Sequence, residues 1–118
     1  MESKKPSIRA LKRTDLIEFY GEPFAQSVRG FAVELEGEPV AIAGVIHTDP
    51  LQVFSTMKDS LRKYPKTIMK TAHRLKSILN KYESPLYAFA DEDEKNSVNF
   101  LKRVGFVQLD DGVFKWVT

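Results

Sequence analysis

The first half of the chain alternates between apolar and polar residues, which predicts strands. The predicted strands in this half are residues 8–11, 31–36, 40–47 and 51–57. Phe31, Val33 and Leu35 recur at every second position, which is the period of a strand with one face in solvent. The run at 40–47 is almost entirely apolar and follows a Gly-Glu-Pro turn, so we expect it to be the second, interior strand of a hairpin.

Apolar residues at intervals of three and four predict three helices. The apolar stripe of the longest helix, residues 65–82, consists of Ile68, Ala72, Leu75, Leu79 and Tyr82. Pro65 suits the first position of this helix because its missing N–H would have no partner there. A short helix extends from a Thr14 cap to Gly21. A third helix at 96–103 ends before Gly105.

The last third of the chain contains three further apolar runs. Residues 86–90 predict a buried strand, and the runs at 106–109 and 113–117 flank an Asp-Asp-Gly turn, which predicts a hairpin. No internal repeat, low-complexity tract or linker interrupts the pattern. Since the chain has 118 residues, we expect one domain over residues 8–118 that follows a flexible tail of residues 1–7.

The composition excludes several kinds of chemistry. The absence of cysteine excludes a thiolate nucleophile, a disulfide and a thiolate zinc site, and it fits a reducing compartment. The only histidines, His47 and His73, are too few for a dedicated metal site. No apolar run approaches the roughly 18 residues of a spanning helix, and the charged start lacks the apolar core of a signal peptide. We therefore expect a cytoplasmic protein with no membrane partner.

Charge is distributed unevenly along the chain. The net charge is +2, but residues 58–81 contain eight lysines and arginines and one acidic residue, Asp59, so this segment carries +7 and the remainder −5. Such asymmetry favours an anionic ligand that faces the segment. A solvated helix face is the alternative explanation of a charge run.

Three short motifs occur in a fixed order along the chain. They are Ile8-Arg9 followed by Asp15, the segment GEPVAIAG at 37–44, and the segment SVNFLKRVGF at 97–106. Together with the order of the predicted elements, they resemble the GNAT superfamily of acetyl-CoA-dependent N-acetyltransferases over nearly the whole chain. The resemblance implies an α+β (mixed α/β) fold with a central, mostly antiparallel sheet and helices on both faces. Strands 51–57 and 86–90 would be its splayed pair of parallel neighbours.

Within the superfamily, the chain is similar to the small GNAT-like proteins of tailed bacteriophages. The segments that carry this similarity are Tyr20-Gly21-Glu22-Pro23, Tyr64-Pro65 and Gly112-Val113-Phe114-Lys115-Trp116. Some of those phage proteins are internal virion proteins. The similarity is therefore compatible with an enzyme or with a virion-associated component.

The resemblance implies an acetyl-CoA site at the start of the long helix. In the superfamily the pyrophosphate contacts backbone N–H groups within the pattern Q/R-x-x-G-x-G/A, which is an anion site at a helix N-terminus. Here Arg62 matches, whereas Pro65 removes a donor and Thr67 adds a side chain where a small residue leaves space. Cationic side chains at the same helix end compensate in part. The residues that the resemblance assigns to cofactor binding are Met57, Lys58, Arg62, Lys63, Lys66, Thr67 and Ser97.

The resemblance also implies a general base and a general acid. The acid is often a tyrosine four residues before the glycine that ends the last helix, and that position is Leu101, which transfers no proton. The candidate catalytic base is His47, at the end of the predicted interior strand, because an imidazole exchanges protons near neutral pH. A turn residue is the alternative role of His47. Asp59 and Glu38 are the remaining candidate carboxylates.

Two functions are compatible with these residues. The first is an acetyl-CoA-dependent N-acetyltransferase that acts on a protein or peptide amine and has a degenerate cofactor loop. The second is a catalytically inactive GNAT-fold phage protein that binds a partner or belongs to the virion. A protein partner or a peptide acceptor fits these hypotheses, and a homodimer is left open. Nucleic-acid binding through the basic segment 58–81 is a third hypothesis, and we rank it last because the chain has neither a recognised module nor a row of aromatic residues for stacking bases.

Overall fold

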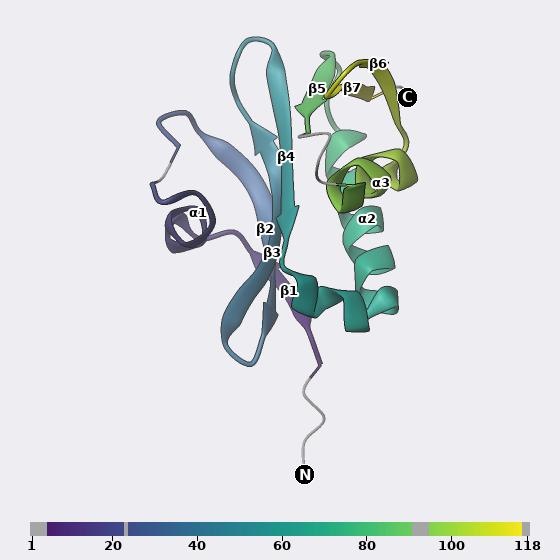
Figure 1. Cartoon of the computed structure of the whole chain (residues 1–118). Coiled ribbons are helices and arrows are strands. Elements are labelled where there is room, and N and C mark those ends of the chain that lie inside the picture. Colours follow the sequence, from purple (N-terminus) through teal and green to yellow (C-terminus); the bar gives the residue numbers. More distant parts are fainter. Residues whose placement is uncertain (1–4, 23, 91–94, 117–118) are drawn as a thin grey trace.

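The computed structural model describes residues 5–22, 24–90 and 95–116, and in the last range it describes side chains from Val98 onward (Figure 1). In chain order the elements are β1 (Ser7–Ala10), α1 (Arg13–Tyr20), β2 (Val28–Leu35), β3 (Glu38–Ile46), β4 (Leu51–Met57), the 3₁₀ helix η1 (Asp59–Lys63), α2 (Pro65–Leu79), β5 (Leu86–Phe89), α3 (Lys95–Val104), β6 (Phe106–Asp110) and β7 (Val113–Trp116). This is the predicted order of strands and helices, with η1 added after β4.

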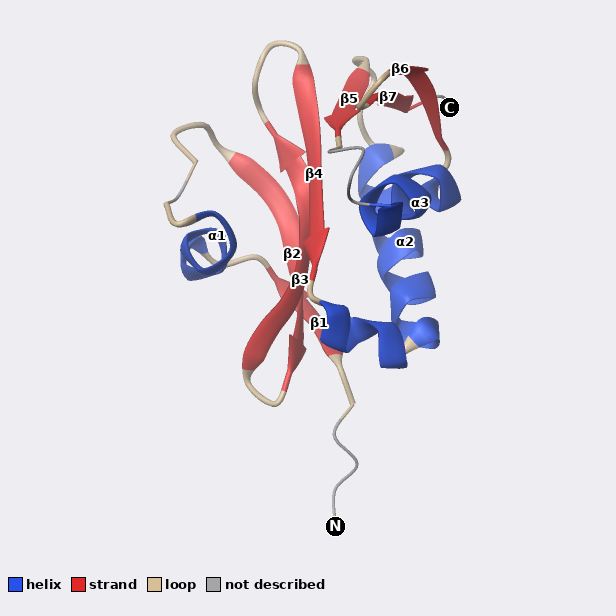
Figure 2. Cartoon of the chain, in the orientation of Figure 1, coloured by secondary structure: helices blue, strands red, loops and turns tan. Residues whose placement is uncertain are grey.

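The strands form one seven-stranded sheet in the order β1-β2-β3-β4-β5-β7-β6. Every neighbouring pair is antiparallel except β4 and β5, which are parallel. Helix α1 lies on one face of the sheet, and α2 and α3 lie on the other (Figure 2). The predicted fold class, a mixed α/β fold with a mostly antiparallel sheet and helices on both faces, is confirmed.

The core consists of two apolar clusters separated by the sheet. The larger one joins α2 and α3 to the sheet and includes the fully buried Leu75, Phe31 and Phe114. The smaller one lies under α1, where Leu16 packs with Ala32. Alternation assigns Ala32 to the solvent-exposed face of the strand at 31–36, but α1 covers it. Our prediction of a solvent-exposed face is therefore wrong at Ala32.

The long helix ends earlier than its apolar stripe predicts. The last helical residue is Leu79, and the N–H groups of Lys81 and Tyr82 donate to carbonyl oxygens only three residues back, at 3.1 Å. Tyr82 continues the apolar spacing, but it does so from a turn. Its hydroxyl is hydrogen-bonded to the Nε2 atom of His47 at 2.8 Å, which accounts for its placement.

The start of the first helix also differs from the prediction. Helix α1 begins at Arg13, and Thr14 does not cap it. Asp15 takes that role, because its Oδ2 atom accepts the backbone N–H of Lys12 at 2.7 Å. The Asp15 carboxylate is almost fully buried and also accepts two hydrogen bonds of 2.8 Å from the guanidinium of Arg9.

The N-terminal boundary is close to the predicted one. Strand β1 begins at Ser7, so one residue of the predicted tail 1–7 belongs to the sheet. Residues 1–4 of that tail lie outside the described residues.

Candidate functional site

The parallel strands β4 and β5 stay together over only three residue pairs. Leu51, Gln52 and Val53 pair with Leu86, Tyr87 and Ala88. Beyond this ladder β4 continues to Met57 beside β3 alone, so the two parallel strands separate as the sequence predicts.

Beyond Val53, no strand among the described residues pairs with the side of β4 that faces away from β3. Lys58 donates its backbone N–H to Val40 of β3 at 2.8 Å, so its backbone faces β3. Because successive residues of a strand face opposite sides, the backbone groups of Ser55 and Met57 face away from β3. An extended ligand can pair with these groups as an added strand does.

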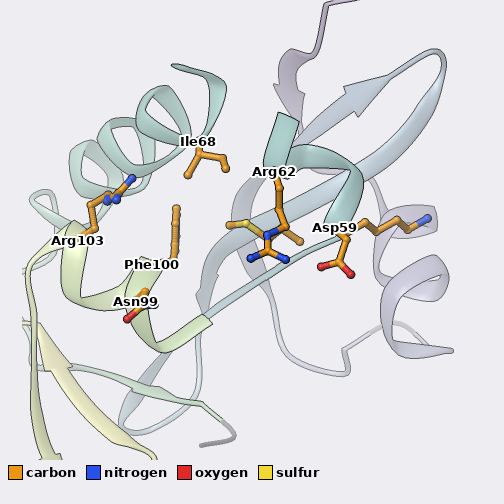
Figure 3. Close-up of a pocket in the computed structure, with 8 residues that line it drawn as sticks. Asp59, Arg62, Ile68, Asn99, Phe100 and Arg103 are labelled. Carbon is orange, nitrogen blue, oxygen red and sulfur yellow. The ribbon is translucent and has the colours of Figure 1, made fainter. Parts of the chain in front are cut away.

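A cleft of about 250 Å³ opens where β4 and β5 separate. Its lining residues are Met57, Lys58, Asp59, Arg62, Ile68, Asn99, Phe100 and Arg103. Met57, Ile68 and Phe100 supply apolar surface. Figure 3 shows Arg62 and Arg103 on opposite sides of Ile68 and Phe100. The cleft therefore combines apolar surface with cations that approach from two different elements, η1 and α3.

The two arginines are the cations available to an anionic ligand. Within the described part of the chain, neither Arg62 nor Arg103 forms an ion pair. Lys58 differs, because its Nζ atom lies 3.7 Å from Glu18 Oε1 and 5.6 Å from the centre of the Phe19 ring. Lys58 is thus directed toward α1, and Arg62 and Arg103 dominate the charge of the cleft.

The backbone at the start of α2 does not form a phosphate cradle. Tyr64 N–H donates to Leu61 O at 2.9 Å, and the N–H groups of Thr67 and Ile68 donate to Tyr64 O at 3.0 and 3.1 Å. Pro65 has no N–H to offer. Leu61 is fully buried, which anchors η1 in the position where the superfamily has a glycine-rich loop. The residues present fit the apolar arm and the negative charge of a coenzyme A molecule. They would contact it through side chains and not through backbone N–H groups.

Three of the seven residues assigned to the cofactor line the cleft. These are Met57, Lys58 and Arg62. Lys63 ends η1, and Lys66 and Thr67 lie in the first turn of α2. These three residues do not line the cleft, and the two lysines are exposed. Ser97 belongs to α3, and its side chain lies outside the described residues.

The structure does not bring His47 to this cleft. His47 follows β3 at the end where Ile46 pairs with Gln52, whereas the cleft begins at Met57. Gln52 and Met57 are five residues apart along β4, which corresponds to about 17 Å. The exposed imidazole is hydrogen-bonded through Nδ1 to Ser27 Oγ at 2.9 Å and through Nε2 to Tyr82. Its catalytic role stays a prediction that this arrangement does not favour.

The structure also shows where the other candidate proton-transfer residues lie relative to the cleft. Leu101 is 3% exposed and packs in the larger cluster, so the cleft has no side chain from that position. Glu38 is exposed at the start of β3 and does not line the cleft. Asp59 does line it, and it is the one carboxylate among the described lining residues.

Sequence reasoning missed four lining residues, Ile68, Asn99, Phe100 and Arg103. Asn99 and Arg103 are four residues apart on α3 and therefore share one side of that helix. This spacing was visible in the sequence. It identifies a polar stripe, but only the packing of α3 beside the free part of β4 turns that stripe toward a cleft.

Within the described residues, no group of three or more histidine, cysteine, aspartate or glutamate side chains is arranged to hold a metal ion. Over the same residues, no helix has the length and apolar character needed to cross a membrane.

Comparison with known proteins identifies the fold. Neither protein-family models nor curated proteins give a match. Among solved structures, the ribosomal-protein-S18-alanine N-acetyltransferase from Escherichia coli is similar with a TM-score of 0.63 and 15% identity, over 94% of this chain and 89% of that one. Mutant forms of the spermidine/spermine N-acetyltransferase SpeG from Vibrio cholerae give 0.56 and 15%, over 94% and 92%.

A third similar structure carries the superfamily name. The GNAT domain of PAT from S. lividans matches with a TM-score of 0.58 and 12% identity, over 92% of this chain and 86% of that domain. The chain therefore has the fold of the GNAT acetyltransferases. The similarity to phage proteins stays a prediction.

Proposed function

We propose that the protein binds acetyl-CoA in the cleft between β4 and β5 and transfers the acetyl group to an amine of a protein or peptide. The observation that carries this proposal is the apolar cleft at the strand separation with Arg62 and Arg103 on its two sides (Figure 3). A long, partly apolar ligand that ends in phosphate groups matches this arrangement.

Each lining residue has a definite role in the proposal. Arg62 and Arg103 hold phosphate oxygens by charge-assisted hydrogen bonds. Met57, Ile68 and Phe100 exclude water from the arm of the cofactor. The remaining predicted cofactor residues are Lys63, Lys66, Thr67 and Ser97, of which Lys63 and Lys66 would add positive charge around the start of α2.

The cofactor supplies an activated acetyl group as a thioester. The chain must accept a proton from the amine, and Asp59 is the lining residue that can do so. Only α1 and a short loop separate β1 from β2, which leaves an open approach for a large acceptor. The similar enzyme from Escherichia coli acts, by its name, on an alanine of a ribosomal protein, and this supports a protein amine as acceptor.

Calorimetric titration with CoA tests the binding step. Arg62→Gln and Arg103→Gln should each weaken binding about tenfold or more, because a hydrogen bond to a charged group contributes about 1.5–3 kcal/mol. Lys70→Gln, on the outer side of α2, removes the same charge away from the cleft and should leave CoA affinity unchanged. Identical affinities in all three variants, or no binding of CoA to the unmodified protein, would exclude the proposed site.

Restoring the superfamily loop provides an independent test. Pro65→Gly with Thr67→Gly returns a backbone donor and removes a side chain, so it should tighten CoA binding. The same substitutions should lower the free energy of unfolding, because glycine increases the entropy of the unfolded chain. An unchanged affinity would show that the helix end does not contact the phosphates.

A catalytically inactive GNAT-fold protein that binds a partner, including a virion-associated phage protein, is the second candidate. The burial of Leu101 favours it, because no proton donor reaches the cleft from that position. Transfer of radioactive acetyl from acetyl-CoA to a mixture of peptides with different N-termini separates the two candidates. Binding of CoA without any transfer supports the second candidate, and transfer that Asp59→Asn abolishes supports the first.

A further inference from the structure

The solvent-facing side of α2 carries a row of basic residues, which we name the α2 ridge. Its members are Lys66, Lys70, His73, Arg74 and Lys76, all of them exposed. Ala72, Leu75 and Leu79 on the opposite side of the helix are buried against the sheet and α3. The ridge is therefore the outer surface of a helix whose inner surface is fully used in the core.

No acidic residue of α2 balances this ridge. The helix contains neither aspartate nor glutamate, and in the parts of the chain that the structure describes the ion pairs are Arg9 with Asp15, Arg9 with Glu34, and Lys58 with Glu18. Lys66, Lys70 and Arg74 follow at intervals of four residues, where like charges repel and destabilise a helix. An external anion would relieve this repulsion.

The positive surface extends from α2 to the neighbouring helix. His73 and Lys76 share a shallow groove of about 100 Å³ with Arg103 of α3, and the exposed Lys102 precedes Arg103. Because the positive surface extends along α2, a partner that covers it must carry negative charge over a length comparable to that of the helix. Helix α2 has 15 residues, and a rise of about 1.5 Å per residue makes it about 22 Å long.

The side chains on the ridge discriminate between anionic partners. Protein interfaces have apolar and aromatic centres, but the ridge has no aromatic residue, and Met69 is the large apolar side chain exposed beside it. Membrane-surface helices insert an apolar face, which here is buried in the core. Single-stranded nucleic acids require aromatic side chains for stacking. Duplex interfaces, in contrast, are polar and strongly positive.

We propose that the α2 ridge binds the phosphate backbone of double-stranded nucleic acid without sequence preference. The helix is packed against the sheet and flanked by α3, so it lies along the phosphates and does not enter a groove. A duplex carries one negative charge per about 1.7 Å, which gives every cation of the ridge a phosphate within reach. The sequence analysis ranks nucleic-acid binding last because a recognised module and stacking aromatic residues are missing, but contacts to the duplex backbone need neither. This inference does not require acetyl transfer, although Lys66 and Arg103 take part in both proposals.

Fluorescence anisotropy with a labelled duplex of about 20 base pairs and arbitrary sequence tests the proposal over a range of salt concentrations. The logarithm of the binding constant should fall linearly with the logarithm of salt concentration, with a slope of about −3 to −5 if four or five phosphates are neutralised. The triple variant Lys66→Gln, Lys70→Gln, Arg74→Gln should bind at least about tenfold more weakly at low salt. Its slope should be smaller in magnitude by about 2 to 3.

A matched control removes the same charge from another surface. Lys12 and Arg13 are exposed at the start of α1, and Lys115 of β7 lies over the Tyr87 ring, on the sheet face opposite the buried Phe114 and Trp116. The triple variant Lys12→Gln, Arg13→Gln, Lys115→Gln should keep the affinity and the slope of the unmodified protein. Equal losses in both triple variants would show that net charge, and not the ridge, drives binding, and this would overturn the proposal.

Two further measurements keep the result unambiguous. Lys66→Arg with Lys70→Arg keeps the charge and should bind the duplex as the unmodified protein does, whereas a loss would contradict a backbone contact. Vesicles of anionic lipid and polyglutamate are the competing probes. Tighter binding to either probe than to the duplex at the same salt concentration would overturn the assignment to nucleic acid.

Discussion

The buried ion pair at the start of α1 leads to a specific prediction about stability. Replacing Asp15 with alanine removes the acceptor of two guanidinium hydrogen bonds of 2.8 Å and of the Lys12 N–H at 2.7 Å. Arg9 then keeps its hydrogen bond to the Ala10 carbonyl oxygen at 3.1 Å and its contact with Glu34, whose Oε2 atom lies 3.2 Å from Nε without hydrogen-bond alignment. The substitution leaves a partly buried cation and an unpaired helix donor.

The expected cost follows from the burial of the two partners. Breaking a buried ion pair costs about 3–5 kcal/mol, and we expect the lower end, about 3 kcal/mol, because the Arg9 side chain is 21% exposed whereas that of Asp15 is 3% exposed. For a chain of this length, 1 kcal/mol changes Tm by roughly 4 °C, so Asp15→Ala should lower Tm by about 12 °C.

The same carboxylate predicts a dependence of stability on pH. Hydrogen bonds from Arg9 lower the pKa of Asp15, burial opposes them, and the Lys12 N–H lowers the pKa further. A lowered folded-state pKa means that this stabilisation is fully present above the unfolded pKa of about 3.9 and disappears as the pH falls through the lower folded value. The difference in Tm between the unmodified protein and Asp15→Asn should therefore shrink below about pH 4.

Urea denaturation at neutral pH, followed by circular dichroism, measures the loss. Glu34→Gln is the matched control, because Glu34 is 29% exposed and makes one contact with Arg9, so its loss should cost no more than about 1 kcal/mol. If Asp15→Ala costs no more than Glu34→Gln, the ion pair does not stabilise the start of α1 and the reasoning is refuted.

Three shorter predictions concern the core, the sheet and the histidine. Leu101→Tyr should overpack the core, lower the free energy of unfolding by about 1–3 kcal/mol and give no acetyl transfer, whereas a stable, active variant would identify a vacated catalytic position. Gly44→Ala would place a Cβ atom against the carbonyl oxygen of Arg29 and should cost a similar amount in urea denaturation, and an unchanged midpoint would contradict this contact. His47→Ala removes two side-chain hydrogen bonds and should lower stability by about 1 kcal/mol while CoA affinity, measured by calorimetry, stays the same. A large loss of CoA affinity would indicate that His47 belongs to the binding site.

Most of the fold could be predicted from local patterns. Strand β4 matches its predicted bounds, and Pro65 and Gly105 mark the start of α2 and the residue after α3. These features depend on the period of apolar residues and on the backbone preferences of proline and glycine, which act within a few residues. The parallel pairing of β4 and β5 came from the resemblance, and it too is confirmed.

The errors arose where a contact between two elements replaces a local preference. Thr14 is a good cap by residue type, but the carboxylate of Asp15 is held by Arg9 of another element, and this contact fixes the start of α1. Tyr82 has the spacing of a helical residue, yet its hydrogen bond to His47 belongs to a turn. A local pattern contains no information about such partners.

The candidate site was predicted in part for the same reason. Met57, Lys58 and Arg62 lie close together in the sequence and were found from the motif that follows β4. Asn99 and Arg103 come from α3, and no local rule places that helix beside the free edge of β4. The hydrogen bonds from the Thr67 and Ile68 amides to the Tyr64 carbonyl oxygen likewise became visible only in three dimensions.

The three-pair ladder between β4 and β5 divides the sheet into two units, β1 to β4 and β5 to β7, which can form at different times during folding. Strands β1 to β4 pair only with sequence neighbours, so this meander can form on the ribosome before residues 86–116 have been synthesised. The second unit then joins through the short ladder and the packing of α3 against α2. Although β4 is a central strand, its Ser55 and Met57 amides should exchange with solvent deuterium as readily as those of an edge strand, and a ligand bound in the separation should slow that exchange.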